Sequence, residues 1–236
     1  MKISKEKIKK CVTVTVLMGL IPLAVLLGVT AFRDRAYIWI ALCVCLLACV
    51  PFFLSFEKRQ SDTKRLMILA AMTAISVAGR ALFYPLAHFK PVAAAVIITG
   101  MYLGGEAGFM CGALSALLSN FIFGQGPWTP FQMFAMGLIG FLAGVLARCG
   151  VLRRSRLSLC LFGVIASVVI YGGIMNPASA LVWARTLDWK LLLSYYLTGL
   201  PVDLIRAAAT WLFLWFAGLP VLEKFDRVKQ KYGLME

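Results

Sequence analysis

The sequence predicts an all-α integral membrane protein, and three observations lead to this fold class. Of the 236 residues, 61% are hydrophobic and only 14% are charged, whereas charged residues make up about 25% of an average soluble domain. Apolar runs of about 20 residues recur along the chain, each long enough to cross roughly 30 Å of hydrocarbon. The stretches between these runs are too short to form a soluble domain, so we expect a membrane domain with short loops.

Eight apolar segments are expected to span the membrane. The first two, at about 11–32 and 37–56, are set apart by the polar stretch EKRQSDTKR, so we divide the chain into residues 1–65 and 66–236. The first segment has a longer apolar core than the 7–15 residues of a usual signal peptide, which favours a retained helix over a cleaved leader. The remaining six spans are expected at about 66–86, 92–103, 109–123, 131–147, 157–174 and 193–222. We expect an amphipathic connection with Trp183 and Trp189 before the last span, and a break or tilt at Pro201 within it.

The distribution of basic residues predicts the orientation. Seventeen of the 24 lysines and arginines fall on the side of the N-terminal tail and five on the opposite side, while Arg80 and Arg206 lie within spans. Cytoplasmic loops carry this excess, so both termini are expected in the cytoplasm of a bacterial cell. The net charge of +14 is then explained by basic residues in the cytoplasmic loops of a protein in the plasma membrane, where lipid surrounds its spans. We expect no nucleic-acid partner, because no basic stripe lies on a soluble face.

Small residues recur at steps of four in three of the predicted spans, which places them on one helix face. Such stripes let helix backbones approach closely in lipid. For the glycine-containing stripes we expect packing within the bundle, whereas the alanine stripe allows two readings, inward packing or contact with a partner helix. The stripes are Ala70, Ala74 and Ala78; Gly108, Gly112 and Ala116; and Gly140 with Gly144.

Three charged residues lie inside apolar spans: Arg80, Asp203 and Arg206. Each costs about 2.5–3.5 kcal/mol at the bilayer centre on insertion scales, so each needs a partner, water or a ligand. One interpretation is a structural ion pair of Asp203 with Arg206 or with Arg80. The other is that these side chains line a cavity open to the outside.

A second candidate for binding is the segment 121–133, with two glycines and two prolines that fix an irregular loop. Trp128 and Phe131 offer flat apolar faces, and Gln125 and Gln132 offer amide groups. This mixture suits an uncharged or zwitterionic organic molecule. An aromatic belt at the membrane surface explains the same residues without a ligand.

No catalytic or metal-binding set is evident in the sequence. There is no phosphate-binding GxxxxGK[ST] loop, no paired-carboxylate or Ser–His–Asp arrangement, and His88 is the single histidine. The seven cysteines form no CxxC pair, so a common zinc site is not expected either. We therefore expect neither an enzyme nor a bound cofactor, and an active transporter of this kind must take its energy from an ion gradient or a separate ATPase.

From about Arg65 to its end, the chain resembles the substrate-binding S component of energy-coupling factor (ECF) vitamin transporters. The resemblance rests on six predicted core helices, on the Ala70–Ala74–Ala78 stripe followed by Arg80, and above all on residues 90–144, KPVAAAVIITGMYLGGEAGFMCGALSALLSNFIFGQGPWTPFQMFAMGLIGFLAG. This string looks most similar to S components linked to cobalamin uptake. The first two predicted spans lie outside the six-helix pattern of the family.

The resemblance implies a mode of action. S components bind a vitamin on the outer side and then topple in the membrane against a transmembrane coupling protein, powered by two separate ATPase subunits. The alanine stripe would then face the coupling protein. The pocket would lie among the loop after the first core helix, the loop near Trp128 and the outer ends of the last helices. The candidate substrate-binding residues are Arg80, His88, Lys90, Gln125, Trp128, Gln132, Asn176, Trp183, Tyr195, Asp203 and Arg206.

Cobalamin is the first substrate that the resemblance suggests, and queuine-type bases and thiamine precursors are alternatives. A secondary transporter driven by an ion gradient is the main rival function. Such transporters usually show two related halves, whereas this sequence has no convincing repeat, and the coupling carboxylate would have to be Asp203. A membrane enzyme or a purely structural protein fits less well.

Overall fold

The computed structural model describes residues 46–47, 49–50, 63–184 and 188–232, and every regular element within them is helical. The predicted span at 11–32 and most of that at 37–56 lie outside the described residues, so the eight-span topology and the division at residue 65 stay predictions. The helices are α4 (Thr63–Leu82), α5 (Val92–Leu103), α6 (Gly105–Phe123), α7 (Thr129–Arg148), α8 (Arg156–Ile165), α9 (Gly173–Trp183), α10 (Trp189–Phe213) and α11 (Leu219–Tyr232).

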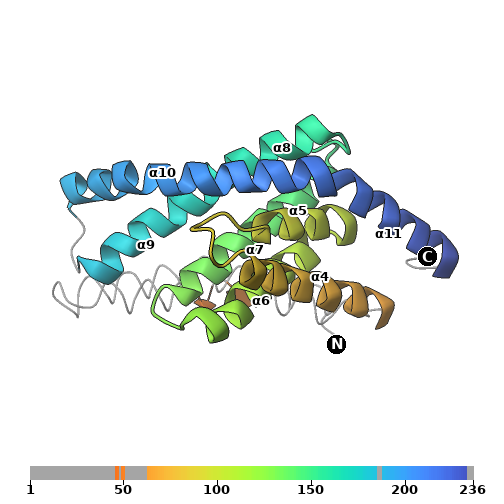
Figure 1. Cartoon of the computed structure of the whole chain (residues 1–236), viewed down its shortest axis with the longest axis horizontal. Helices are drawn as coiled ribbons and strands as arrows, with labels where there is room; N and C mark the ends of the chain where they lie inside the picture. The colour runs from red at the N-terminus through yellow and green to blue at the C-terminus, as the bar shows by residue number, and fades with distance from the viewer. Residues whose placement is uncertain (1–45, 48, 51–62, 185–187, 233–236) are drawn as a thin grey trace, which may run out of the picture.

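These eight helices form six rods (Figure 1), because the π-helical segments η2 (Ala166–Gly172) and η3 (Leu214–Gly218) join α8 to α9 and α10 to α11 without a break. Among the described residues, five rods are long and apolar enough to cross a membrane. The sixth, α5, has 12 residues and is about 18 Å long at 1.5 Å per residue. The six-helix, all-α membrane core predicted from the sequence is thus confirmed.

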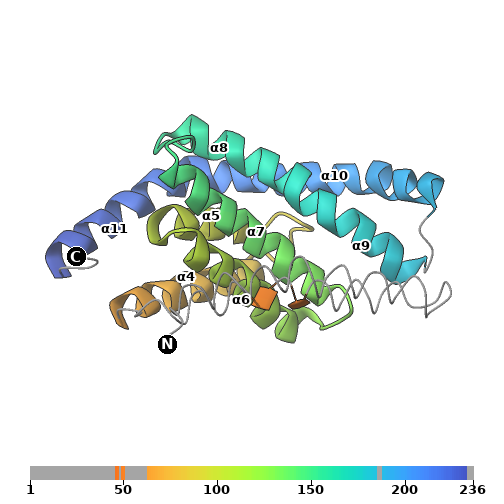
Figure 2. The ribbon, with the colours of Figure 1, turned by 180° about the vertical axis from the view of Figure 1, so that it is seen from behind.

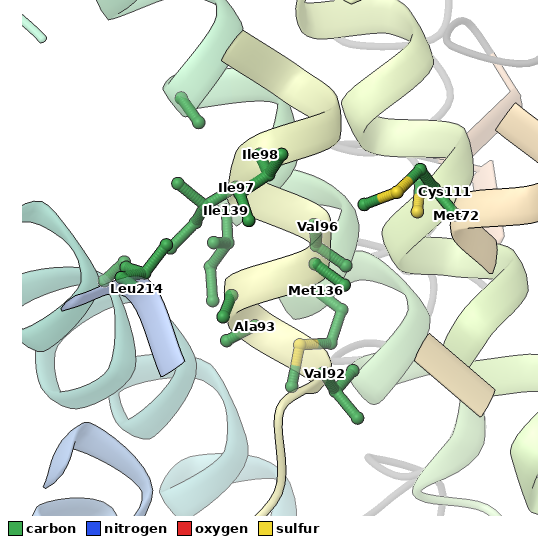
Figure 3. Packing of buried hydrophobic residues seen from close by; sticks show 14 of the residues in the cluster. Met72, Val92, Ala93, Val96, Ile97, Ile98, Cys111, Met136, Ile139 and Leu214 are labelled. Atoms are coloured by element: carbon green, nitrogen blue, oxygen red, sulfur yellow. The ribbon is translucent and has the colours of Figure 1, made fainter. Parts of the chain in front are cut away.

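Helix α5 lies at the centre of the bundle and packs against α4, α6, α7 and α10. Its sequence, VAAAVIITGMYL, is apolar on every side, which is the pattern of a helix that is buried all round. Figure 3 shows Val96 and Ile97 of α5 among side chains of the neighbouring helices, including Ile139 of α7 and Leu214 of η3. This short helix fixes the positions of the longer ones around it.

The glycine stripes hold α5, α6 and α7 at close distance, as predicted; the three helices lie side by side in Figures 1 and 2. A Cβ atom at Gly140 would collide with the backbone carbonyl of Gly108, and one at Gly100 with that of Gly140. A Cβ at Gly112 would meet the backbone of Met136 in the same way. Only glycine fits at these crossings, so the stripes serve packing.

We expect Gly140→Ala to lower the stability of the protein by about 1–3 kcal/mol, because two backbones must separate to admit the methyl group. Gly173→Ala is the matched control, since a Cβ at Gly173 has no neighbour within 4 Å and the residue is helical. Thermal unfolding of both variants in detergent or nanodiscs checks this. Equal unfolding temperatures for the two variants would contradict the close packing.

The structure corrects two predictions about the last spans. The helix expected to end near residue 174 continues to Trp183 through Pro177, so the stretch with Trp183 is helical rather than a connection. Helix α10 also runs unbroken through Pro201. A proline removes one backbone donor, and within a membrane bundle neighbouring helices and local π-helical adjustments let the helix continue, which a rule drawn from soluble helices misses.

Helix boundaries elsewhere shift by a few residues. Helix α4 ends at Leu82 rather than near 86, and α6 starts at Gly105 because Gly104 alone, with φ of +94°, makes the turn. The basic tail expected after residue 222 is helical as far as Tyr232. It is tied to the core where the Tyr102 hydroxyl donates to the carbonyl of Phe225 at 2.7 Å.

Candidate substrate site

A cavity of about 490 Å³ opens among the loop 83–91, the start of α5, and the helices α6, α7, α9 and α10. Five of its side chains carry or can carry a charge, and several others offer aromatic or amide groups. Its described lining is Arg80, His88, Lys90, Val92, Ala93, Ala116, Gln132, Met136, Tyr171, Met175, Asn176, Ser179, Trp183, Tyr195, Thr198, Gly199, Val202, Asp203 and Arg206.

An ion pair on α10 forms part of the cavity lining. Arg206 donates from Nη1 to Oδ1 of Asp203 at 2.5 Å, three residues earlier on the same helix face. Asn176 of α9 donates from Nδ2 to the other carboxylate oxygen at 3.0 Å. The Asp203 side chain is buried, and both of its oxygens are satisfied. Of the pairings expected from the sequence, Asp203 with Arg206 is the one that forms.

Two glycines make room for this network. A Cβ at Gly172 would collide with the Asp203 carboxylate, and one at Gly199 would collide with the Asn176 amide. The guanidinium of Arg206 lies 4.0 Å from the ring centroid of Tyr171, which belongs to η2. The π-helical segment therefore places an aromatic face against the cation that lines the cavity.

Arg80, near the end of α4, bonds to neutral partners among the described residues. Its Nη1 donates to Oγ of Ser119 at 2.5 Å and to Oδ1 of Asn120 at 2.9 Å. The Asn120 amide nitrogen in turn donates to Thr129 and to Gln132. These two bonds orient the amide so that its oxygen faces Arg80, and they link the cavity wall to the first turn of α7.

The loop between α4 and α5 brings two further basic residues, His88 and Lys90, to the cavity. His88 adopts a φ of +60°, a left-handed conformation that is uncommon outside glycine but enriched in histidine. Lys90 lies over the rings of Tyr84 and Phe123, with Nζ at 5.7 and 5.8 Å from their centroids. The Phe123 ring also lies 5.2 Å from Cζ of Arg80.

The charges of this loop influence one another. Burial lowers the pKa of the Lys90 ammonium, and the positive charges of Arg80 and Arg206 lower it further. Burial, Arg206 and Lys90 also lower the pKa of His88, while the Asp203 carboxylate opposes this shift. The lowered pKa favours the neutral form of His88 at pH 7. Among the described lining residues, Arg80, Lys90 and Arg206 outnumber the single carboxylate, Asp203.

Aromatic side chains close one end of the site. Trp128 and Trp183 stack with their rings 6.3 Å apart and nearly parallel, at 16°. Trp183 is 70% exposed and lines the cavity, so its ring is available to a second flat molecule. Tyr195 of α10 also lines the cavity.

A family model described as the S component of ECF-type riboflavin transporters matches residues 60–212. The chain belongs to this family. Comparison with curated proteins and with solved structures gave no match.

As an ECF S component, the chain is a multi-pass protein of the cell membrane. It is a binding protein for transport and not an enzyme, and its partners are a vitamin substrate and an ECF module. The model that matches is of the riboflavin type, so the prediction of a cobalamin-linked S component is not supported. The long string at 90–144 that suggested cobalamin lies almost wholly within the packed unit of α5, α6 and α7. The residues there are set by helix packing and do not indicate which substrate is bound.

The cavity brings together most of the residues predicted for substrate binding in this S component. Two of them do not line it. Gln125 bonds instead to the Leu117 carbonyl of α6 and to Thr129 at the start of α7. Trp128 contacts the lining residue Trp183. Those that line it are Arg80, His88, Lys90, Gln132, Asn176, Trp183, Tyr195, Asp203 and Arg206.

Sequence reasoning missed other lining residues, of which Tyr171 has the closest contact with a charge. It lies in a run that reads as an ordinary apolar span, and no sequence signal marks the π-helical segment that turns it inward. Ser179 and Thr198 were also missed. A small polar residue within an apolar span was the available signal for both.

A second, apolar groove of about 700 Å³ lies between α4 and α6. The alanines of the predicted stripe, Ala70, Ala74 and Ala78, line this groove and are exposed rather than packed in the core. Other lining side chains include Thr73, Met110 and Leu114. The inward-packing interpretation of the stripe is thus wrong for these three side chains.

No group of three or more His, Cys, Asp or Glu side chains that is able to hold a metal ion occurs within the described residues.

Proposed function

We propose that this S component captures a flat, vitamin-like organic molecule in the cavity between the loop 83–91 and the outer parts of α9 and α10. The observation that carries the proposal is the convergence of charged, amide and aromatic side chains from five helical segments and the loop 83–91 on one cavity. Ligand sites have this form: a concave, largely apolar wall with a few fixed polar groups. The Trp183 ring supplies a stacking surface.

The size of the cavity supports a substrate of riboflavin size. Its volume of about 490 Å³ lies within the range of roughly 300–1,000 Å³ typical of small-molecule sites. A corrinoid with its nucleotide arm is several times larger than a flavin and would not be enclosed. The riboflavin-type family match supports the same substrate class.

We further propose that the groove between α4 and α6 is the contact surface for the transmembrane coupling protein. Exposed alanines at steps of four allow another helix to approach closely, and the groove is almost wholly apolar. Delivery of the substrate then uses the two ATPase subunits of the ECF module. An ion-gradient mechanism is less well supported, because Asp203 is committed to Arg206 and Asn176.

Purified alone, the chain is expected to bind its substrate without ATPase activity, since the sequence has no phosphate-binding loop. Accumulation of the substrate in proteoliposomes should require the coupling protein, both ATPases and ATP. The measurement compares uptake by the chain alone, under a sodium or proton gradient, with uptake by the assembled complex. Concentrative uptake by the chain alone would favour the secondary-transporter alternative and contradict the proposed dependence on an ECF module.

A further inference from the structure

Building on the proposed function, we infer that the substrate of this S component carries an anionic group, a carboxylate or a phosphate, which binds between Arg80 and Lys90. The sequence suggested an uncharged or zwitterionic ligand, and riboflavin itself is uncharged. The inference therefore narrows the substrate class beyond what the family match gives.

The first argument is the charge balance of the cavity. Its described lining holds Arg80, Lys90 and Arg206 but only one carboxylate, Asp203. That carboxylate is 2.5 Å from Arg206 and also accepts from Asn176, so its charge is already matched. Two positive charges are left without a counter-charge from the part of the chain that the structure describes.

The second argument is the bonding of Arg80. A guanidinium has five N–H donors in a planar fork. Hydrogen bonds to described residues come from Nη1 alone, and both acceptors, Ser119 and Asn120, are neutral. The Nη2 and Nε donors make no such bond, and the Arg80 side chain lines the cavity. A carboxylate or phosphate takes two parallel bonds from such a fork.

The third argument is the position of Lys90. Lys90 and Arg80 lie over the same ring, with Nζ at 5.8 Å and Cζ at 5.2 Å from the centroid of Phe123. Cation–π contacts compensate these charges in part, but an aromatic ring has no net charge. The pKa of Lys90 is lowered first by burial and then by the positive charges of Arg80 and Arg206, so repulsion adds to the cost of burying this ammonium group. A bound anion removes the repulsion from both cations at once.

The test uses matched pairs of probes that differ in one anionic group: riboflavin and riboflavin 5′-phosphate, nicotinamide and nicotinate, pyridoxal and pyridoxal 5′-phosphate. Affinities are measured for the full chain in nanodiscs by quenching of tryptophan fluorescence, with calorimetry as a second readout. In at least one pair the anionic member should bind about tenfold more tightly or better, as expected for charge-assisted hydrogen bonds. A preference for phosphate members over nicotinate, or the reverse, distinguishes the two anions.

Variants assign the preference to the two cations. Arg80→Gln and Lys90→Gln should each reduce it about tenfold, while Lys90→Arg retains most of it because the charge is kept. Lys190→Gln is the matched control, since Lys190 is exposed at the start of α10 and does not line the cavity. Thermal unfolding of each variant shows whether a lost preference is due to a lost fold. The comparison of neutral and anionic probes on the wild-type chain does not depend on any variant.

The outcomes separate this inference from the function it rests on. Tight binding of neutral members with no preference for their anionic partners would overturn the anionic substrate and leave the proposed function standing. A preference that survives in both Arg80→Gln and Lys90→Gln would overturn the assignment to these cations. Absence of binding by every probe would overturn both proposals.

Discussion

Replacing Ala74 with leucine is expected to reduce uptake by the assembled transporter to background while the purified chain keeps its substrate affinity and its unfolding temperature. Ala74 is exposed on α4 and lines the apolar groove, so added bulk there displaces no core side chain. It does prevent another helix from approaching closely, which is what small residues permit in membrane interfaces. The measurements are substrate binding by the variant alone, co-purification with the coupling protein, and uptake in proteoliposomes.

Ala71→Leu is the matched control for this variant. Ala71 lies three residues before Ala74 on the same helix, is exposed as well, and does not line the groove. The same change in volume on another face of α4 should leave assembly and uptake near the wild-type level. If Ala71→Leu fails to assemble as badly as Ala74→Leu, the effect belongs to α4 in general. If Ala74→Leu loses substrate binding yet still assembles, the groove is not the partner surface.

The part of the fold that the sequence predicts best is the unit of α5, α6 and α7. Its helices are bounded by strong local signals, Pro91 before α5, Gly104 and Gly124 with positive φ at two ends, and Pro130 in the first turn of α7. The glycine spacing also predicts the close backbone contact. These signals act within a few residues, so they can be read without the tertiary structure.

The last two rods were predicted less well because their course depends on neighbours. Pro201 suggested a break or tilt, and the preceding span was expected to end near residue 174. Both Pro177 and Pro201 lie inside continuous helices. The π-helical segments, in which the backbone bonds shift register, carry no sequence mark. Whether a helix in lipid continues through a proline is decided by packing around the freed carbonyl, which a local rule does not contain.

Charged residues within apolar spans were the strongest guide to the candidate site. A charged side chain in lipid is so costly that Arg80, Asp203 and Arg206 each need a polar partner or a water-filled cavity. All three line the candidate substrate cavity. The sequence did not predict which charges pair, because helix spacing permits Asp203 to meet Arg206 but says nothing of Arg80 across the bundle. Gln125, predicted to bind substrate, does not line the cavity, because loop composition does not reveal which amides bond to neighbouring helices instead.

The pair of Asp203 and Arg206 offers the largest expected effect on stability. Their side chains are only 6% and 15% exposed, and removing one partner of a buried ion pair leaves an uncompensated charge that costs about 3–5 kcal/mol. Asp203→Asn and Arg206→Met should each lower the unfolding temperature by many degrees. Asparagine keeps an oxygen acceptor for Asn176, and methionine keeps an unbranched stem against Tyr171, so the lost charge is the main change.

The double variant Asp203→Asn/Arg206→Met separates structure from binding. Because neither residual charge remains, its stability should return close to that of the wild type. Substrate affinity, measured with the tightest probe of the wild type, should stay at least about tenfold lower, since the guanidinium that lines the cavity is gone. Full recovery of affinity together with stability would show that the pair only holds α10 in place. Recovery of neither would mean that the carboxylate itself, held between Asn176 and Gly172, shapes the cavity wall.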